Sequence, residues 1–538
     1  MKLIDRKFVK RIVATAGVPV VMMLSFSMCS EKALDLQPLG SLTDQTFYNT
    51  AKDFDAATLA PYSTMLNLTY DQGGRGWWNT WLLPDDDVQP RNPNTTNDVF
   101  NWTATSDDIT WVWQTAYTGI GRANIIIVQL PKATGLSDAQ KPRYEAEAKF
   151  MRAWWYFILA RGYGDVPIVT DVPSAVDQTQ VGNSKPGEVW DLIEADLTFA
   201  AANLPAAFPS QKGRATKYTA SALLGKVQLF RAQWFKTPAK YQQAITNLTA
   251  AMAGPYSLTA NYADNFAEDK ENNSESYFEL QTAVGDDINS WGTSDTGGNA
   301  GHAWNVIVSP SCSPIPPNDC APGANGKGYG TYDLSMSLYN EFEPNDPRRF
   351  YTMYSAGEDY GGTPYKATWS RTGHTAAKYN RPWQPNRDPA NWSKNNLRFI
   401  RLSDVMLMLA EAKLLGNNDV AGAAALVNQV RARARNTPVN GVTPPAGTLP
   451  DVPAAGAPLA WHKQYLQHER RWHNELASSL NGLPRWRDRA RLLREVILPR
   501  PGYLLTMYGL TPWAFILLPG LYTHRCLRGL FRILTGRK

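Results

Sequence analysis

Hydrophobic residues recur every three or four positions along much of the chain, which is the spacing of amphipathic helices. In KPGEVWDLIEADLTFAAANLP, which starts at Lys185, the positions Trp190, Ile193, Leu197 and Ala200 would form one buried face. The other predicted helices run from Ser137 to a stop at Gly162 and Gly164 and over residues 215–230, 241–252, 397–415 and 420–434. Strand-like alternation is sparse, so the pattern predicts a mostly α fold.

Two of these helices flank the short link Gly416-Asn417-Asn418-Asp419. We expect Gly416 to end the first helix as a C-cap and Asn418 or Asp419 to begin the second as an N-cap. So short a link makes the helices antiparallel neighbours, as in tetratricopeptide-like repeats, although no clean 34-residue period is present. The small side chains of the second helix would allow close packing: Ala421, Ala423, Ala424 and Ala425. Three arginines in its last turn would lie at the negative end of the helix dipole: Arg431, Arg433 and Arg435.

Helical periodicity fades between about residues 254 and 395, where Gly, Asn, Asp, Pro and Trp are frequent. The composition indicates long ordered loops. Loops of this length in a compact protein are usually functional, so we expect a ligand-binding region here.

The N-terminus has the order of parts of an export signal. A basic start is followed by a mostly apolar stretch over residues 12–28, which Pro19 interrupts, and then by Cys29. This order predicts a lipoprotein signal peptide over residues 1–28, with Cys29 as the lipidated (palmitate-bearing) residue. The alternative is ordinary secretion with a free cysteine, because Met28 is larger than the small residue usual before a lipidated cysteine.

The cysteine positions limit the possible disulfides, and the charge distribution limits the possible class of ligand. Only four cysteines occur in 538 residues; Cys312 and Cys320 could close a small disulfide loop, and Cys526 has no evident partner. Residues 461–538 hold 14 Lys and Arg against 4 Asp and Glu, whereas the rest of the chain holds 40 against 44. Because the body is mildly acidic, composition argues against a nucleic-acid-binding protein.

Several blocks, in order, resemble the SusD/RagB family of outer-membrane nutrient-uptake lipoproteins. They are LDLQPLGSLTDQTFYNTAKDFDAATLAPYSTM, WQTAYTGIGRANIII, AEAKFMRAWWYFILARGYGDVPIV, GRATKYTASALLGKVQLF, YQQAITNLTAAMAGPYSLTANYADNF, NDPRR, RLSDVMLMLAEAKL and LVNQVRARA. The resemblance covers about residues 30–435. It implies a SusD-like domain over residues 29–490, in which tetratricopeptide-like helix pairs support a loop-rich ligand-binding half.

The resemblance also implies what the protein does. Such proteins are non-catalytic and need no cofactor; they are lipid-anchored at the cell surface, on the outer membrane. They capture oligosaccharides, or in some members peptides, and pass them to a SusC-like TonB-dependent transporter.

A sugar site needs flat aromatic rings flanked by carboxylate, amide and guanidinium groups. The stretch DQGGRGWWNTWLLPDDD, which starts at Asp71, and the mid-chain loops offer such residues. The candidate ligand-binding residues are Arg75, Trp77, Trp78, Asn79, Trp81, Asp85, Trp291, Trp304 and Asn305.

Other tryptophans and acidic residues have structural interpretations. We expect Trp154, Trp155 and Trp190 to lie in the core, and we favour packing also for Trp369, Trp383 and Trp392. The triple Asp85-Asp86-Asp87 lacks the spacing of an EF-hand calcium loop, so we expect a solvated turn and no metal site.

Motifs of catalysis do not occur: the sequence has no HExxH, no GxSxG and no phosphate-binding loop. A glycoside hydrolase remains an alternative, because two carboxylates at the right separation leave no short motif. A helical-repeat scaffold that binds no small ligand is the third hypothesis, after the glycan-binding protein and the glycoside hydrolase.

The resemblance weakens after Ala434. HERRWHNELASSLNGLPRWRDRARLLREV keeps parts of the family's closing helix, and nothing beyond Val496 matches. The basic and apolar tail over residues 491–538 could be a second membrane anchor, an amphipathic segment lying on a membrane, or the product of a frameshift. We favour the frameshift, in which case the tail carries no function.

Overall fold

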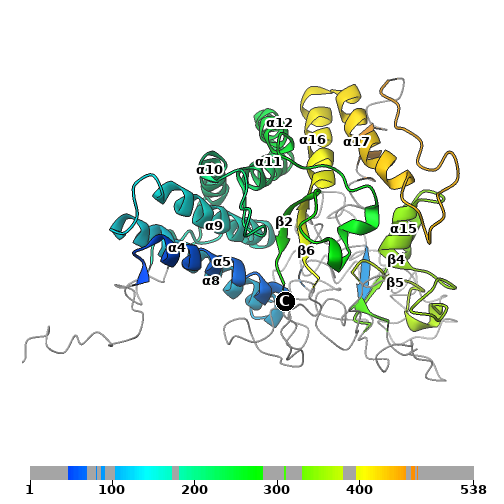
Figure 1. The fold of residues 1–538 in the computed structure, drawn as a ribbon, viewed down its shortest axis with the longest axis horizontal. Coiled ribbons are helices and arrows are strands. Elements are labelled where there is room, and N and C mark those ends of the chain that lie inside the picture. The colour runs from blue at the N-terminus through cyan, green and yellow to red at the C-terminus, as the bar shows by residue number, and fades with distance from the viewer. Residues whose placement is uncertain are drawn as a thin grey trace, which may run out of the picture.

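A computed structural model describes residues 47–69, 80, 87–90, 103–172, 181–282, 308–310, 330–379, 395–455, 462, 463, 465, 466 and 469. Helices dominate these residues, which confirms the predicted mostly α fold (Figure 1). The α-helices are α4 (Ala51–Ala57), α5 (Leu59–Ser63), α6 (Leu66–Thr69), α8 (Asp107–Gln129), α9 (Lys141–Tyr163), α10 (Glu188–Asn203), α11 (Lys217–Trp234), α12 (Ala239–Met252), α14 (Met336–Glu341), α15 (Pro347–Thr352), α16 (Leu402–Asn417) and α17 (Val420–Arg435). The strands are β1 (Val88–Pro90), β2 (Ser276–Leu280), β3 (Tyr332–Leu334), β4 (Met353–Tyr354), β5 (Thr375–Ala376) and β6 (Leu397–Arg401); short 3-10 helices cover Leu130–Lys132, Tyr262–Asn265, Glu268–Lys270 and Ala367–Trp369.

The long helices form one continuous row. Each of α8, α9, α10, α11, α12, α16 and α17 packs on the next in that order (Figure 1). The step from α12 to α16 bridges residues 253–401, which therefore form an insertion between two neighbouring helices. This insertion corresponds to the region that the sequence predicts to be rich in loops.

Helix α9 is the second helix of the row and is buried on nearly all sides from Phe150 to Arg161. Its Trp154 ring lies 5.3 Å from Phe278 of β2 and 5.1 Å from Phe399 of β6, measured between centroids. Because α8 and α10 cover its other sides, no polar face remains. The predictions that Trp154, Trp155 and Trp190 belong to the core are confirmed.

Helix boundaries follow local capping chemistry. Gly164 is the C-cap of helix α9 and has a positive φ of 82°. Glycine adopts such a backbone conformation at little cost in free energy because it has no Cβ atom. Helix α11 begins after Thr216, whose side chain forms a capping box with Thr219. The predicted face of α10 is confirmed, since Trp190, Ile193, Leu197 and Ala200 are all buried.

The link between α16 and α17 differs in part from the prediction. Gly416 is not the C-cap: it lies inside α16, and the cap is Asn418 in a left-handed conformation with φ of 53°. A Cβ atom on Gly416 would lie 2.6 Å from the Cβ atom of Tyr241, so this glycine lets α16 approach α12 closely. Asp419 is the N-cap of α17, as predicted, and accepts a hydrogen bond from Gly422 N–H at 2.8 Å.

The predicted helix over residues 397–415 is wrong in its first turn. Leu397–Arg401 form strand β6, which pairs antiparallel with β2 so that Leu280 lies opposite Leu397. Helix α16 starts only at Leu402. The strand forms here because β2, more than a hundred residues earlier in the chain, supplies the backbone partner.

A second sheet joins three strands of the insertion, β3, β4 and β5, to β1 from the N-terminal part of the chain, and we call it the sheet of the insertion. It has the order β1-β3-β5-β4 with antiparallel pairing throughout, and Asp333 of β3 lies opposite both Gln89 of β1 and Thr375 of β5. Helix α15 runs directly into the edge strand β4. The insertion is therefore a small sheet with short helices and loops, attached to the side of the helical row (Figure 1).

Candidate functional site

All the candidate ligand-binding residues lie outside the described residues. They are Arg75, Trp77, Trp78, Asn79, Trp81, Asp85, Trp291, Trp304 and Asn305. Cys29, Cys312 and Cys320 lie outside them as well, and so do the signal peptide and the tail. These assignments stay predictions, and the described residues show the framework to which the candidate stretches are attached.

The tryptophan-rich stretch that ends at Asp87 is attached at both ends to ordered elements. Before it, the Trp111 indole of α8 donates a hydrogen bond to the carbonyl oxygen of Asn67 at 2.8 Å. After it, the Ser335 N–H donates to the carbonyl oxygen of Asp87 at 2.9 Å, and β1 begins at the next residue. Asp87 is buried, so the solvated turn predicted for Asp85 to Asp87 is wrong at its last residue. The stretch therefore connects the helical row to the sheet of the insertion.

The end of the β2–β6 pair is the attachment point of two stretches. One is residues 283–307, which hold the candidates Trp291, Trp304 and Asn305, and the other is residues 380–394. Thr282, the last described residue before residues 283–307, donates its N–H to Asn396 Oδ1 at 2.8 Å. Asn396 lies just after residues 380–394, at the entry to β6. Because β2 and β6 are antiparallel, the exit from one strand and the entry to the other meet at the same edge.

A polar cluster occupies this edge. Asn396 donates its backbone N–H to Glu271 Oε1 at 2.6 Å and its side-chain amide to Glu279 Oε2 at 2.9 Å. Arg398 pairs with Glu279 at 3.3 Å. Burial raises the pKa of the Glu271 carboxyl to about 7, although the Asn396 N–H and the charge of Arg398 lower it. The cluster thus fixes the base of the candidate stretch 283–307 and of residues 380–394, and it contains a carboxyl group whose pKa lies near neutral pH.

A compact aromatic group supports the sheet. Trp369 packs edge-on against Tyr365 and Tyr360, with ring centroids 5.6 and 5.9 Å away. The same group contains Tyr354 of β4, and all four rings are buried. The favoured packing role of Trp369 is confirmed; Trp383 and Trp392 lie outside the described residues.

The arginines of α17 do more than face the end of the helix dipole. Arg433 pairs with the buried Glu275 at 2.6 Å, and Arg431 pairs with Glu343 at 2.7 Å and Glu469 at 2.6 Å. Of the four alanines expected to allow close packing, Ala423 and Ala424 are buried and Ala421 and Ala425 are exposed.

Burial raises the pKa of Glu275, but the opposing charges of Arg433 and Arg401 and the hydrogen bonds from Arg433 and Ser403 prevail and lower it to about 2. The Glu275 carboxylate therefore stays ionised across the physiological range and joins α17 to the start of β2.

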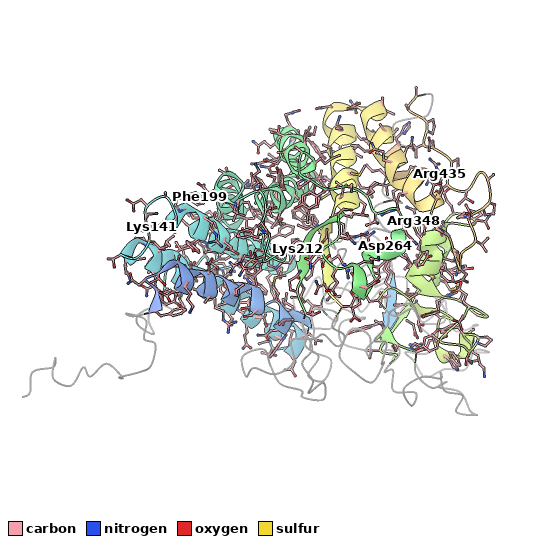
Figure 2. All side chains as sticks on the ribbon, in the orientation of Figure 1. Lys141, Phe199, Lys212, Asp264, Arg348 and Arg435 are labelled. Carbon is pink, nitrogen blue, oxygen red and sulfur yellow. The ribbon has the colours of Figure 1, made fainter. Side chains whose placement is uncertain are left out.

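A second buried network centres on Arg348 of α15 (Figure 2). Its guanidinium binds Asp346 at 2.8 Å and Glu469 at 2.7 Å, and all three side chains are fully or almost fully buried. Sequence reasoning missed this network, although Asp346 and Arg348 belong to the NDPRR block and Glu469 to the HERR block. The signal was the presence of complementary charges in two family-like blocks far apart in the chain.

The described residues contain neither a metal-binding cluster nor a membrane-spanning helix. No group of three or more His, Cys, Asp or Glu side chains there could hold a metal ion. None of the helices in that part of the chain is long and apolar enough to cross a membrane.

Two family profiles match the chain. The profile described as "Starch-binding associating with outer membrane" matches residues 85–229, and the profile described as "SusD family" matches residues 242–473. A SusD-like protein of Bacteroides ovatus is 27% identical over 454 residues, which cover 78% of this chain and 76% of the relative.

Solved structures with the same fold are also found. A SusD-like carbohydrate-binding protein of Bacteroides fragilis aligns with a TM-score of 0.65 and 24% identity, over 81% of this chain and 85% of its own. A laminarin-binding SusD-like protein aligns with a TM-score of 0.62 and 23% identity, over 89% of this chain and 98% of its own. At these identities the structures establish the fold alone.

Proposed function

The chain belongs to the SusD/RagB family, and from this premise we propose that it is a non-catalytic glycan-binding protein of the cell surface. It captures an oligosaccharide and delivers it to a SusC-like TonB-dependent transporter. Lipidated Cys29 anchors it to the outer membrane.

One observation carries the proposal: the candidate stretches are attached to the two sheets of the insertion. The stretch with Trp77, Trp78 and Trp81 enters β1, and the stretch with Trp291 and Trp304 leaves from the edge of β2. A rigid base lowers the entropy lost when aromatic loops close on a sugar ring. Two structural neighbours support an oligosaccharide as the ligand class, since one is named as laminarin-binding and another carries a xylogluco-oligosaccharide.

Calorimetric titration with soluble starch, laminarin and xyloglucan oligosaccharides tests glycan binding. We expect saturable binding to at least one of them, with the oligosaccharide recovered intact by mass spectrometry. Shortened products would instead favour a glycoside hydrolase. No binding to any glycan or to a peptide panel would favour the scaffold.

The aromatic contacts are tested by the triple substitution W77A/W78A/W81A. Stacking on an aromatic ring contributes about 1 kcal/mol or more per ring, so we expect binding to weaken at least about tenfold. The matched control is Phe235→Ala, because Phe235 is an exposed aromatic residue in the turn between α11 and α12. Equal affinity of the triple variant and the unmodified protein would contradict the assignment of these tryptophans.

Transport partnership and anchoring have separate tests. Affinity purification of the protein from outer membranes should co-purify a TonB-dependent transporter. Mass spectrometry of the mature N-terminus should show acylated Cys29, and Cys29→Ser should release the protein from the membrane fraction. An unmodified Cys29 would contradict the lipid anchor.

A further inference from the structure

Glu469 binds two buried arginines at once. Its Oε2 accepts a hydrogen bond from Arg348 Nη1 at 2.7 Å, and its Oε1 accepts one from Arg431 Nη1 at 2.6 Å. All three side chains are fully buried. A carboxylate with one arginine on each oxygen is held in a fixed position by charge-assisted hydrogen bonds.

The two arginines come from different parts of the molecule. Arg348 belongs to α15 in the insertion, and Arg431 belongs to α17 in the helical row. The two helices are in contact (Figure 1). Arg348 also pairs with Asp346 of the insertion, whereas Arg431 of the helical row pairs with Glu343, which lies in the insertion as well. Glu469 is the carboxylate that they share.

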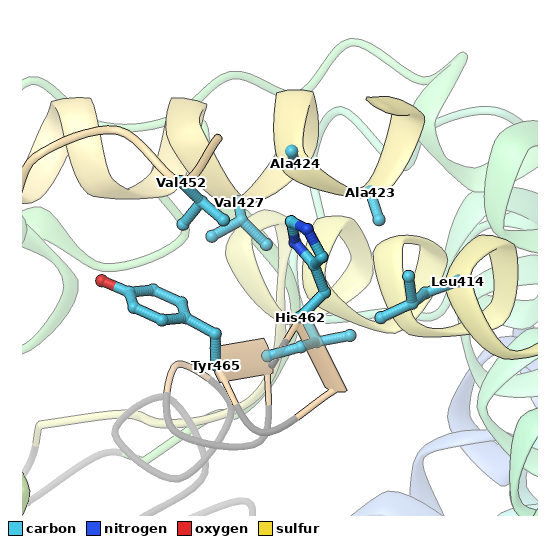
Figure 3. Close-up of a pocket in the computed structure, with 8 residues that line it drawn as sticks. Leu414, Ala423, Ala424, Val427, Val452, His462 and Tyr465 are labelled. Atoms are coloured by element: carbon cyan, nitrogen blue, oxygen red, sulfur yellow. The ribbon is translucent and has the colours of Figure 1, made fainter. Parts of the chain in front are cut away.

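The segment around Glu469 lies against the helical row. His462, Tyr465 and Leu466 line a small apolar pocket with Leu414 of α16 and with Ala423, Ala424 and Val427 of α17 (Figure 3). The Tyr465 hydroxyl donates a hydrogen bond to Glu343 Oε1 at 2.7 Å, and the Arg431 guanidinium lies 4.8 Å from the Tyr465 ring centroid. We call the described residues 462, 463, 465, 466 and 469 the strap. The pocket contacts place it on α16 and α17, and the Tyr465 hydrogen bond joins it to Glu343 of the insertion.

We infer that Glu469 is a positioning residue for ligand binding, which fixes the sheet of the insertion on the helical row. Helix α15 continues into β4, β4 pairs with β5, β5 with β3 and β3 with β1. Strand β1 follows the tryptophan-rich stretch directly. The inference rests on the proposed function for its ligand, but the mechanical link from Glu469 to β1 does not depend on which ligand is bound.

Charge explains why the position needs a carboxylate. Without the negative charge of Glu469, the guanidiniums of Arg348 and Arg431 face one another in a buried site, where like charges repel strongly. Other contacts also join α15 to its surroundings, among them the hydrogen bond from the Tyr351 hydroxyl to Pro438. The expected defect is therefore a looser sheet rather than complete unfolding.

Hydrogen–deuterium exchange of the full chain with Glu469→Gln tests the link without any glycan. We expect exchange at residues 347–354 and 375–377 to become about tenfold faster, while α9 and α11 keep their protection. The matched control is Asp196→Asn, which breaks a buried pair with Arg152 at 2.8 Å inside the helical row. In that variant, exchange should become faster in α9 and α10, and exchange in the sheet should change less. Unchanged exchange at residues 347–354 in Glu469→Gln would overturn the inference.

A double variant keeps the test decisive if Glu469→Gln folds poorly. Arg431→Met removes the guanidinium that would repel Arg348, so E469Q/R431M should exchange more slowly at residues 347–354 than E469Q alone. Faster or equal exchange would count against the charge mechanism.

Titration of the same variants with soluble starch, laminarin and xyloglucan oligosaccharides supplies the binding readout. We expect Glu469→Gln to weaken binding about fivefold and Asp196→Asn to leave it unchanged. If the unmodified protein binds none of these glycans, the proposed function fails while the exchange data still decide the role of Glu469.

Discussion

Glu271 shows how one residue can make stability depend on pH. Its folded-state pKa of about 7 lies above the ordinary value of 4.5 for a glutamate, chiefly because burial disfavours the charged carboxylate. A group with a raised pKa binds an extra proton in the folded state, so its stabilising contribution is complete below about pH 4.5. That contribution is lost as the pH rises through about 7.

Glu271→Gln should therefore change the pH profile of thermal unfolding. Glutamine keeps an oxygen that can accept the Asn396 N–H but carries no charge. We expect the variant to melt close to the unmodified protein at pH 5 and about 1–2 °C higher at pH 8, a small shift because Glu271 is only half-buried. Scanning calorimetry at both pH values measures this, with the more exposed Glu188→Gln as control. An identical difference at pH 5 and pH 8 would rule out titration of Glu271.

At the scale of elements, the contact between α12 and α16 depends on one missing side chain. Gly416 lies against Tyr241, and the atom that an added methyl group would meet is the Tyr241 Cβ, which cannot move without the backbone. Alanine would gain up to about 1 kcal/mol of helix propensity but would force the helices apart, at a cost of about 1–3 kcal/mol.

We therefore expect Gly416→Ala to lower the free energy of unfolding by about 1 kcal/mol. Gly121→Ala is the control, because Gly121 lies in α8 with no atom within 4 Å of an added Cβ. The control should gain about 0.5–1 kcal/mol from propensity alone. Denaturant titration compares the two, and a gain of stability in Gly416→Ala would show that the helices adjust without cost.

The elements also show what could be predicted from sequence and what could not. Helices such as α10 were predicted because their burial follows the 3.6-residue period, and Asp419 because capping is local chemistry. Strand β6 was predicted as helix because its strand pairing depends on β2, and nothing in Leu397–Arg401 itself indicates that partner. The Glu469 network was missed for the same reason, since Arg348 lies 121 residues earlier. The candidate ligand residues are predicted only because aromatic, amide and charged side chains occur together in short stretches. The glycan titrations of the tryptophan variant proposed above test them.

On the scale of the whole molecule, the strap separates the part of the C-terminus that the fold uses from the rest. The family profile ends at residue 473, shortly after Glu469, and we propose that the later residues contribute nothing to folding or binding. This extends the frameshift interpretation of the tail, residues 491–538, to residues 474–490.

A chain that stops after residue 473 should therefore melt at the same temperature as the full chain and bind the same glycans. A chain that stops after residue 461 lacks Tyr465 and Glu469 and leaves Arg348 and Arg431 without their shared carboxylate. Loss of one partner of a buried pair costs about 3–5 kcal/mol, so this shorter chain should melt well below the other. Equal melting temperatures of the two shortened chains would show that the strap does not stabilise the fold. A lower melting temperature of the longer one than of the full chain would show that residues after 473 contribute to stability.

The packing of α12 on α16 has an evolutionary consequence. The antiparallel contact of Tyr241 with Gly416 brings the end of α12 near the start of α16, so the insertion leaves and re-enters the helical row at one place. A segment with this geometry can be exchanged between relatives as a module if its strand β3 still pairs with β1, which lies outside it. Such an exchange would let ligand preference diverge while the helices stay constant. A chimera that exchanges residues 253–401 would have to keep an arginine at the position of Arg348, because Glu469 comes from outside the module and would otherwise be buried with only Arg431 to neutralise it.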